Sequence, residues 1–120
     1  MKRAIVTGPT GVIGSALIKK LISENVEVYT VIRASSKRKE LIPKHKLVKV
    51  IECDLDNFDK LYTLIDTSCD VFFHLAWAGT DDPANRFDMY LQNKNIKYSL
   101  DAVQAAIVIG RSEERRVGKE

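Results

Sequence analysis

The segment that decides the fold is TGPTGVIG, residues 7–14. It follows a short apolar run, residues 3–7, that is typical of a buried strand. It also opens a segment, residues 11–24, whose apolar side chains recur at helical spacing. The three glycines therefore lie in and just after the turn between a strand and a helix, which is where a dinucleotide site needs them.

Each glycine of this turn has a separate expected role. Gly8 permits a sharp turn out of the strand, Gly11 lets a pyrophosphate approach the backbone, and Gly14 lets the helix pack closely. The N-terminus of the helix then offers free N–H groups and a positive dipole end to phosphates. The alternative is a tight strand-to-helix turn that binds no ligand.

Strands and helices alternate along the rest of the chain. Strands are predicted over residues 3–7, 26–32, 47–53 and 71–75. Asp56 is predicted to cap a helix that extends to Ile65, and a long helix is predicted from about Asn85. That helix carries an apolar stripe of Met89, Ile96, Leu100, Val103 and Ile107.

This alternation predicts an α/β fold with a parallel sheet and helices on both faces. The expected architecture is a Rossmann-type, doubly wound sheet that is incomplete, with about four strands in the order 3-2-1-4.

Composition restricts the class of protein. The chain has 120 residues, 45% hydrophobic and 29% charged, which fits one soluble domain. Its net charge of +3 is too small to indicate nucleic-acid or membrane binding. We find no export signal or membrane span, and therefore expect a cytoplasmic protein. Cys53 and Cys69 are expected to be reduced thiols, and no metal site is predicted.

With its G-x-x-G-x-x-G turn, the sequence resembles the extended short-chain dehydrogenase/reductases, and more narrowly the NAD(P)-dependent epimerase/dehydratase family. Four further segments carry the resemblance: VEVYTVIR at residues 26–33, CDLD at residues 53–56, VFFHLA at residues 71–76 and NIKYS at residues 95–99. The likeness extends from residue 2 to about residue 110.

The resemblance implies a set of cofactor-binding residues. The pyrophosphate would be lined by Gly8, Thr10, Gly11, Val12, Ile13 and Gly14. The adenine would lie by Asp54 and Leu55, and the nicotinamide-side ribose would lie over Ala76, Trp77 and Ala78. Asn95 would face the cofactor from the long helix. Asp54 could instead be a helix cap, and Asn95 a surface residue, while Trp77 departs from the small residue usual in the family.

The end of the second predicted strand indicates which cofactor is bound. An NAD site usually has an acid there, but this chain reads Val31-Ile32-Arg33. Arg33, with Ser35 and Lys37, would suit the 2′-phosphate of NADP. We therefore expect NADP, with NAD as the second choice. The alternative is a solvated basic loop.

Catalytic residues are not predicted in this chain. The resemblance implies a Tyr-x-x-x-Lys pair with an upstream Ser or Thr, but the one literal match, Tyr90 to Lys94, precedes the segment where the family has it. Residues 111–120, RSEERRVGKE, resemble the translation of a sequencing adapter. We therefore divide the chain into a partial NAD(P)-binding domain, residues 1–110, and a non-native tail. The alternative for the tail is a natural charged helix end.

The resulting hypothesis is the N-terminal, NADP(H)-binding part of an epimerase, dehydratase or reductase that is inactive alone. By analogy, the full-length protein would transfer hydride to or from a small-molecule substrate, a nucleotide sugar or similar alcohol or carbonyl. The resemblance also allows a homodimer of the full-length protein. The alternative is a non-catalytic NAD(P)-binding regulator or sensor.

Overall fold

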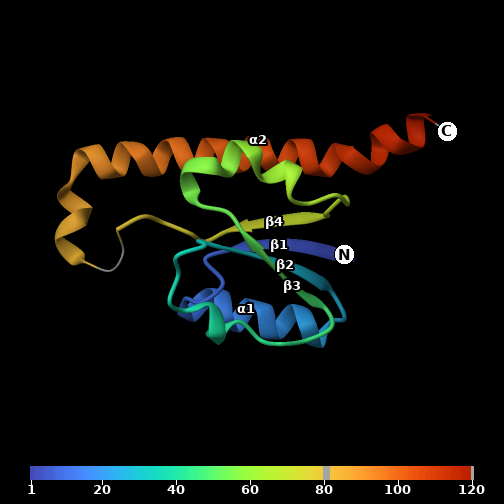
Figure 1. Cartoon of the computed structure of the whole chain (residues 1–120), viewed down its shortest axis with the longest axis horizontal. Coiled ribbons are helices and arrows are strands. Elements are labelled where there is room, and N and C mark those ends of the chain that lie inside the picture. Colours follow the sequence, from blue (N-terminus) through green and yellow to red (C-terminus); the bar gives the residue numbers. More distant parts are fainter. Residues whose placement is uncertain (80–81, 120) are drawn as a thin grey trace.

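Four parallel strands form the sheet of this computed structural model, in the order β3-β2-β1-β4 (Figure 1). The strands are β1 (Arg3–Thr7), β2 (Glu27–Ile32), β3 (Val48–Glu52) and β4 (Val71–His74). The structure describes the backbone of residues 1–79 and 82–119, and the side chains of residues 1–79 and 82–110. The predicted fold class and strand order are therefore confirmed.

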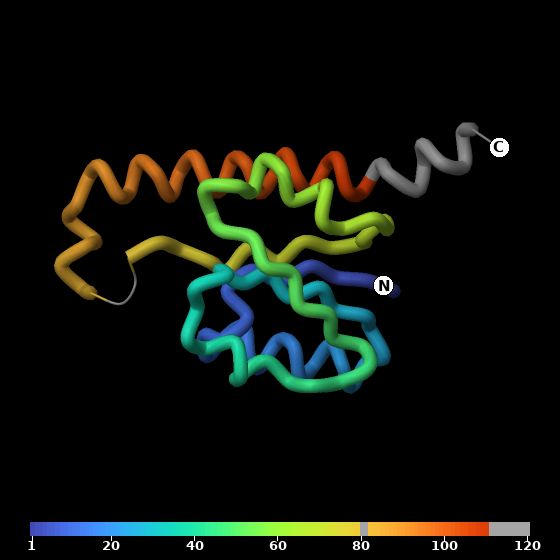
Figure 2. The backbone as a smooth tube through the Cα atoms, viewed as in Figure 1, coloured from blue at the N-terminus to red at the C-terminus, as the bar shows by residue number. Residues whose placement is uncertain are grey.

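Helices cover both faces of the sheet. α1 (Val12–Ser23) lies on one face, and the 3-10 helix η2 (Leu55–Thr63) and α2 (Met89–Lys119) lie on the other (Figure 1). Figure 2 shows residues 55–63 running beside the middle of α2 on that second face, where the two elements are in contact. Short 3-10 helices occupy two connections, η1 (Lys39–Leu41) and η3 (Pro83–Phe87).

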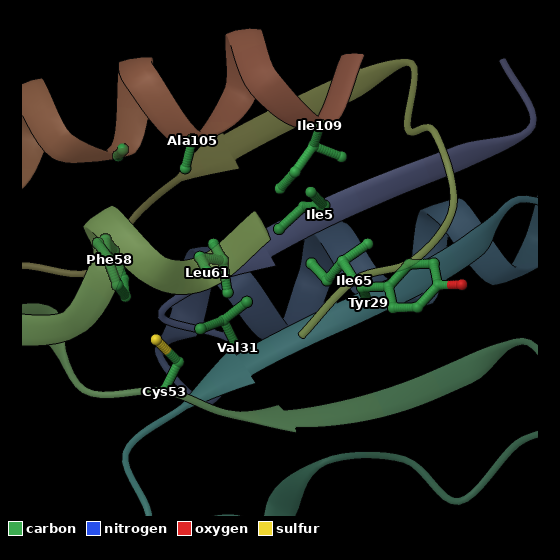
Figure 3. Packing of buried hydrophobic residues seen from close by; sticks show 10 residues of the cluster. Ile5, Tyr29, Val31, Cys53, Phe58, Leu61, Ile65, Ala105 and Ile109 are labelled. Atoms are coloured by element: carbon green, nitrogen blue, oxygen red, sulfur yellow. The ribbon is translucent and has the colours of Figure 1, made fainter. Parts of the chain in front are cut away.

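The alternation of side chains along β1 divides the core into two clusters. Ile5 points into the cluster on the α2 face, while Ala4 and Val6 belong to the cluster on the α1 face. The larger cluster, part of which is shown in Figure 3, comprises Ile5, Tyr29, Val31, Cys53, Phe58, Leu61, Ile65, Ala102, Ala105 and Ile109. Full burial of a side chain the size of Phe58 stabilises the fold by about 1.5–3 kcal/mol.

The predicted cap of the helix after β3 is wrong. The helix is a 3-10 helix that begins at Leu55, so Asp54 is the N-cap residue, and Asp54 makes no side-chain cap hydrogen bond. The carboxylate of Asp56 instead accepts a hydrogen bond from the Tyr98 hydroxyl at 2.6 Å. This bond raises the pKa of Tyr98 to about 12, because ionisation would place a second negative charge beside Asp56. Asp56 therefore joins η2 to α2 and does not cap a helix.

The long helix also differs from its prediction. It begins at Met89, because residues 83–87 form the separate helix η3. Every member of the predicted apolar stripe is at least 40% exposed. The buried face of the described part of α2 carries Asn95, Tyr98, Ala102, Ala105 and Ile109. Two alanines on that face let the helix approach η2 and the sheet more closely than larger side chains would allow.

The proposed tail, residues 111–120, has side chains outside the described part of the structure, and the prediction of a non-native segment stays a prediction. No helix in the described part of the chain is long and apolar enough to span a membrane.

Candidate functional site

A cleft of about 500 Å³ opens at the carboxyl ends of β1, β2 and β4. Its lining consists of residues 8–11, residues 31–33, residues 75–79, and Ser36, Arg38, Cys53, Leu55 and Phe58. Because β2 and β4 lie on opposite sides of β1, the cleft is at the point where the strand order reverses, which is the usual ligand site of an open parallel α/β sheet. Its volume suits a small-molecule ligand.

Two glycines of the turn are required by the fold itself. Gly8 has φ +68°, and a Cβ there would lie 2.9 Å from the Ala76 nitrogen. A Cβ on Gly14 would overlap the Gly8 carbonyl oxygen and lie 3.1 Å from the Pro9 carbonyl carbon. Any larger residue at either position must therefore move backbone, which is costly in a close-packed turn.

Gly11 differs from the other two glycines because the fold does not require it. Its φ is −72°, and a Cβ there would meet only the Gly8 carbonyl oxygen, at an ordinary 3.8 Å. As the N-cap of α1 it offers no side chain to the first N–H groups of the helix, which have no partner within the helix. Because Gly11 lines the cleft, a Cβ there would occupy space beside these donors, where an anion would bind.

The β4 end of the cleft, residues 75–79, is held by a buried amide. Asn95 is 1% exposed, its Oδ1 accepts from the Ala78 N–H at 2.8 Å, and its Nδ2 donates to the Ala78 carbonyl at 3.1 Å. The Trp77 indole Nε1 donates to Gln92 Oε1 at 3.1 Å. Side chains of α2 thus fix the backbone and the aromatic ring of this loop before any ligand binds.

A second contact joins this loop to β1. The Thr7 hydroxyl oxygen accepts from the N–H groups of Leu75 at 2.9 Å and Ala76 at 3.1 Å. Its own proton therefore points to His74 Nδ1, 2.8 Å away, which must be unprotonated. Burial lowers the pKa of His74, in agreement with a neutral ring.

His74 itself lies behind the cleft and not in its lining. Its Nε2 is buried with no hydrogen-bond partner among the described residues, and its ring meets Phe58 edge-on, with centroids 5.7 Å apart. These contacts fit a core histidine.

The β2 end of the cleft, residues 33–38, is exposed and positively charged. Arg33, Ser36 and Arg38 line it, and the Arg38 guanidinium donates from Nη2 to the Thr10 carbonyl at 2.8 Å. Among the described residues that line the cleft, none is Asp or Glu. Two guanidinium groups without a carboxylate favour an anionic ligand at this end.

The structure brings about half of the predicted site residues into the cleft. Those that line it are Gly8, Thr10, Gly11, Arg33, Leu55, Ala76, Trp77 and Ala78. Those that do not line it are Val12, Ile13, Gly14, Ser35, Lys37, Asp54 and Asn95.

Three of these seven residues have other contacts or positions. Gly14 packs against the glycine turn, and Asn95 holds the loop of residues 75–79 by accepting a hydrogen bond from the Ala78 N–H. Asp54 borders a separate depression of about 340 Å³, and its carboxylate accepts from the Ala34 N–H at 3.3 Å.

Sequence reasoning missed several lining residues, of which Ser36 and Arg38 matter most. Both stand in the basic segment after β2, but the sequence does not show which of its alternating residues turn inward. The literal Tyr-x-x-x-Lys match lies away from the cleft: Tyr90 is 86% exposed, and neither it nor Lys94 is part of the lining. Burial raises the pKa of the Cys53 thiol, which therefore stays protonated and poorly nucleophilic at neutral pH.

Sequence comparison identifies the class of protein that this fold and cleft define. The model of the NAD-dependent epimerase/dehydratase family matches residues 4–114, and the chain therefore belongs to this family. No curated protein has a significant sequence match.

Solved structures of epimerases and related enzymes share the fold. WbmH from Bordetella bronchiseptica, in complex with NAD+, is 25% identical with a TM-score of 0.71, and the match covers 91% of this chain and 36% of that one. UDP-glucose 4-epimerase from Thermotoga maritima, with UDP-glucose, is 26% identical with a TM-score of 0.67, covering 90% and 35%. UDP-N-acetylglucosamine 4-epimerase from Methanobrevibacter ruminantium, in complex with UDP-N-acetylmuramic acid, is 27% identical with a TM-score of 0.66, covering 87% and 33%.

The chain spans about a third of the length of these relatives. Its fold is that of a Rossmann domain of the epimerase/dehydratase type.

Proposed function

We propose that this chain is the NADP(H)-binding, N-terminal part of a longer epimerase, dehydratase or reductase that acts by hydride transfer. The observation that carries the cofactor preference is the β2 end of the cleft, where Arg33 and Arg38 flank the glycine turn and none of the described lining residues is Asp or Glu. A 2′-phosphate carries about two negative charges, which two guanidinium groups can neutralise through charge-assisted hydrogen bonds.

The residues of the cleft fit the successive parts of a dinucleotide. Arg33 and Arg38 would hold the 2′-phosphate, and the open N-terminus of α1 beside Gly11 would hold the pyrophosphate. The loop from Leu75 to Gly79 would support the nicotinamide half. A Cβ at position 11 is compatible with the fold but would fill the space beside the helix N-terminus. We therefore infer that ligand binding, and not folding, requires a glycine at this position.

When bound, the nicotinamide supplies a carbon that gives or takes hydride. The described residues would bind and orient the nicotinamide. No Tyr-Lys pair lies at the cleft among them, so we assign none of them a role in proton transfer. We therefore propose that the proton-transferring residues belong to other parts of the longer protein. The coverage of about a third of each relative supports this proposal. A nucleotide sugar is the proposed substrate class, because two similar structures contain UDP-linked compounds.

The test is a calorimetric titration of the 120-residue chain with NADP+ and with NAD+. We expect NADP+ to bind more tightly, and Arg33→Asp to weaken NADP+ binding by about thirtyfold, since a hydrogen bond to a charged group contributes about 2 kcal/mol. The same substitution should change NAD+ binding much less, because NAD+ has no phosphate at that position.

Lys44→Asp is the control, because it makes the same charge change at an exposed position in the β2–β3 connection outside both cavities. It should leave the NADP+ to NAD+ affinity ratio unchanged. If Arg33→Asp also leaves that ratio unchanged, the proposed NADP preference is wrong.

A further inference from the structure

The last residues of two neighbouring strands, Thr7 of β1 and His74 of β4, lie side by side at the carboxyl edge of the sheet. Their side chains are in contact, with Thr7 Oγ1 and His74 Nδ1 2.8 Å apart. Each residue immediately precedes a wall of the cleft, because Gly8 follows Thr7 and Leu75 follows His74. Neither Thr7 nor His74 is part of the lining, so the pair can affect a ligand only through the backbone that it holds.

The hydrogen-bonding capacity of the Thr7 hydroxyl is fully used. A hydroxyl has two acceptor lone pairs and one proton. The N–H groups of Leu75 and Ala76 occupy both lone pairs, so the proton is left for His74 Nδ1. If Nδ1 took up a proton, both side chains would be donors, and Thr7 could accept from His74 only by releasing Leu75 or Ala76. Thr7 is fully buried, so a released N–H group would lose its partner inside the protein.

The backbone that would be released belongs to the cleft. Leu75 and Ala76 line it, and the glycine turn packs against them so closely that a Cβ on Gly8 would lie 2.9 Å from the Ala76 nitrogen. A shift of Ala76 would therefore disturb both the loop of residues 75–79 and the glycine turn. A proton on a side chain outside the lining is thus coupled to the positions of two walls of the cleft.

We propose that His74 is a positioning residue: its unprotonated Nδ1 orients the Thr7 hydroxyl, and this hydroxyl holds the loop of residues 75–79 in the position that binds a dinucleotide. This inference rests on the proposed function, because it takes the ligand to be a dinucleotide. Ligand binding should then favour the neutral ring of His74, so that the ligand and the proton oppose each other although they bind different atoms.

Charged neighbours do not determine the protonation state of His74. Burial is the cause of its lowered pKa, and no charged group contributes to the shift. Tyr98, on the buried face of α2, has a pKa of about 12 and stays neutral in the same pH range. The charged groups on the described parts of the elements around His74 are Arg3 on β1, Asp56, Asp59 and Lys60 on η2, and Lys94, Lys97 and Asp101 on α2.

The test measures the affinity of the full chain for NAD+ by calorimetry at a series of pH values at which circular dichroism shows the chain to be folded. NAD+ is the probe because the 2′-phosphate of NADP+ has a pKa of about 6 and would titrate in the same range. The affinity should be constant above about pH 6.5, the ordinary pKa of histidine. Below the folded-state pKa of His74 it should fall by up to about tenfold for each pH unit, the slope for one linked proton.

Two substitutions of His74 separate its proton from its hydrogen bond. His74→Asn keeps an acceptor for the Thr7 hydroxyl and cannot take up a proton, so its affinity for NAD+ should stay level as the pH falls. His74→Leu removes the acceptor and should bind NAD+ about fivefold more weakly than His74→Asn at neutral pH, the effect of one lost hydrogen bond. His45→Gln is the matched control, because His45 is exposed and is the only other histidine, and it should keep the full pH dependence.

Nuclear magnetic resonance gives a second readout that a merely structural role would not change. In His45→Gln the remaining histidine ring signal belongs to His74. Because linkage is reciprocal, saturation with NAD+ should lower the pKa of His74 further.

The outcomes separate this inference from the proposed function. The role of His74 is wrong, while the proposed function stands, if NAD+ binds and its affinity does not depend on pH, or depends on pH equally in His74→Asn. An unchanged titration of His74 in the presence of NAD+ leads to the same conclusion. If neither NAD+ nor NADP+ binds the unmodified chain at neutral pH, the proposed function is wrong and the role of His74 falls with it.

Discussion

The two ends of the cleft are built in different ways. At the β4 end, the buried Asn95 and the Thr7 hydroxyl hold the loop backbone from behind. At the β2 end, the side chains of Arg33 and Arg38 are exposed, and the backbone is held mainly by short-range contacts such as the bond from the Ser36 N–H to the Arg33 carbonyl at 3.1 Å.

The β4 end therefore determines the shape of the cleft, and the β2 end determines its charge. The β4 end is part of the fold, so substitutions there should change stability as well as binding. The β2 end contributes charge from a surface segment, so substitutions there should change which ligand binds and leave stability almost unaltered. The glycine turn joins the two ends of the cleft, so substitutions in this turn, taken together, should affect both stability and ligand binding.

The largest effect is expected from Gly14→Ala, which disrupts the turn between the two ends. Its Cβ would overlap the Gly8 carbonyl, and we expect a loss of about 3 kcal/mol in the free energy of unfolding, measured by urea denaturation. Gly110→Ala is the matched control, because a Cβ there meets nothing within 4 Å and alanine favours a helix. Equal stability of the two variants would contradict the close packing described for the turn.

Asn95→Ala should destabilise the β4 end next. It leaves the N–H and carbonyl of Ala78 without the buried amide that pairs with both, and the expected loss is about 2 kcal/mol. Asn93→Ala is the control, since Asn93 is exposed on the same helix. Chemical denaturation should show a loss for Asn95→Ala alone. A loss of the same size in both variants would mean that the loop is not held by this amide.

His74 should make the stability of the β4 end depend on pH. Its pKa is lowered by burial, so the folded state favours the neutral ring and the unfolded state takes up a proton first as the pH falls below about 6.5. The free energy of unfolding should therefore be highest above that pH and decrease as the pH falls toward the folded-state pKa.

His74→Asn keeps an acceptor for the Thr7 hydroxyl and should remove this pH dependence. His45→Gln is the control, because His45 is exposed and is the only other histidine. Denaturation at a series of pH values tests both variants. An unchanged pH dependence in His74→Asn would contradict a neutral, half-buried ring at this position.

The smallest effect on stability is expected at the β2 end. Arg33→Ala removes an exposed side chain and should change the free energy of unfolding by less than about 0.5 kcal/mol. A larger loss in urea denaturation would show that this end, like the other, belongs to the folded framework.

The sequence predicted the sheet well because its strands are short apolar segments between clear turn signals. The parallel order follows from alternation with helices, and residues 3–7 form β1 as predicted. The glycine turn was also placed correctly, since its spacing depends only on local geometry.

The remaining features of the site and of α2 depend on three-dimensional packing, which the spacing of residues along the sequence does not show. Asn95 was predicted to face the cofactor. In the structure its amide bonds to the backbone of Ala78, 17 residues earlier in the chain, and this contact depends on how α2 packs against the loop. The apolar stripe of that helix, which includes Ile96 and Leu100, suggested the wrong buried face because alanines allow a closer approach. Arg38 was overlooked because its bond to Thr10 joins segments 28 residues apart.

Gly11→Ala tests most directly whether the cleft is a dinucleotide site. The fold has room for this methyl group, so the free energy of unfolding should fall by less than about 1 kcal/mol, the cost of alanine at an N-cap position. The methyl group fills the space beside the α1 N-terminus, so calorimetry should show NADP+ binding weakened by about tenfold or more. Such a small change in stability together with unchanged NADP+ binding would show that the glycine turn does not hold a pyrophosphate and would contradict the proposed dinucleotide site.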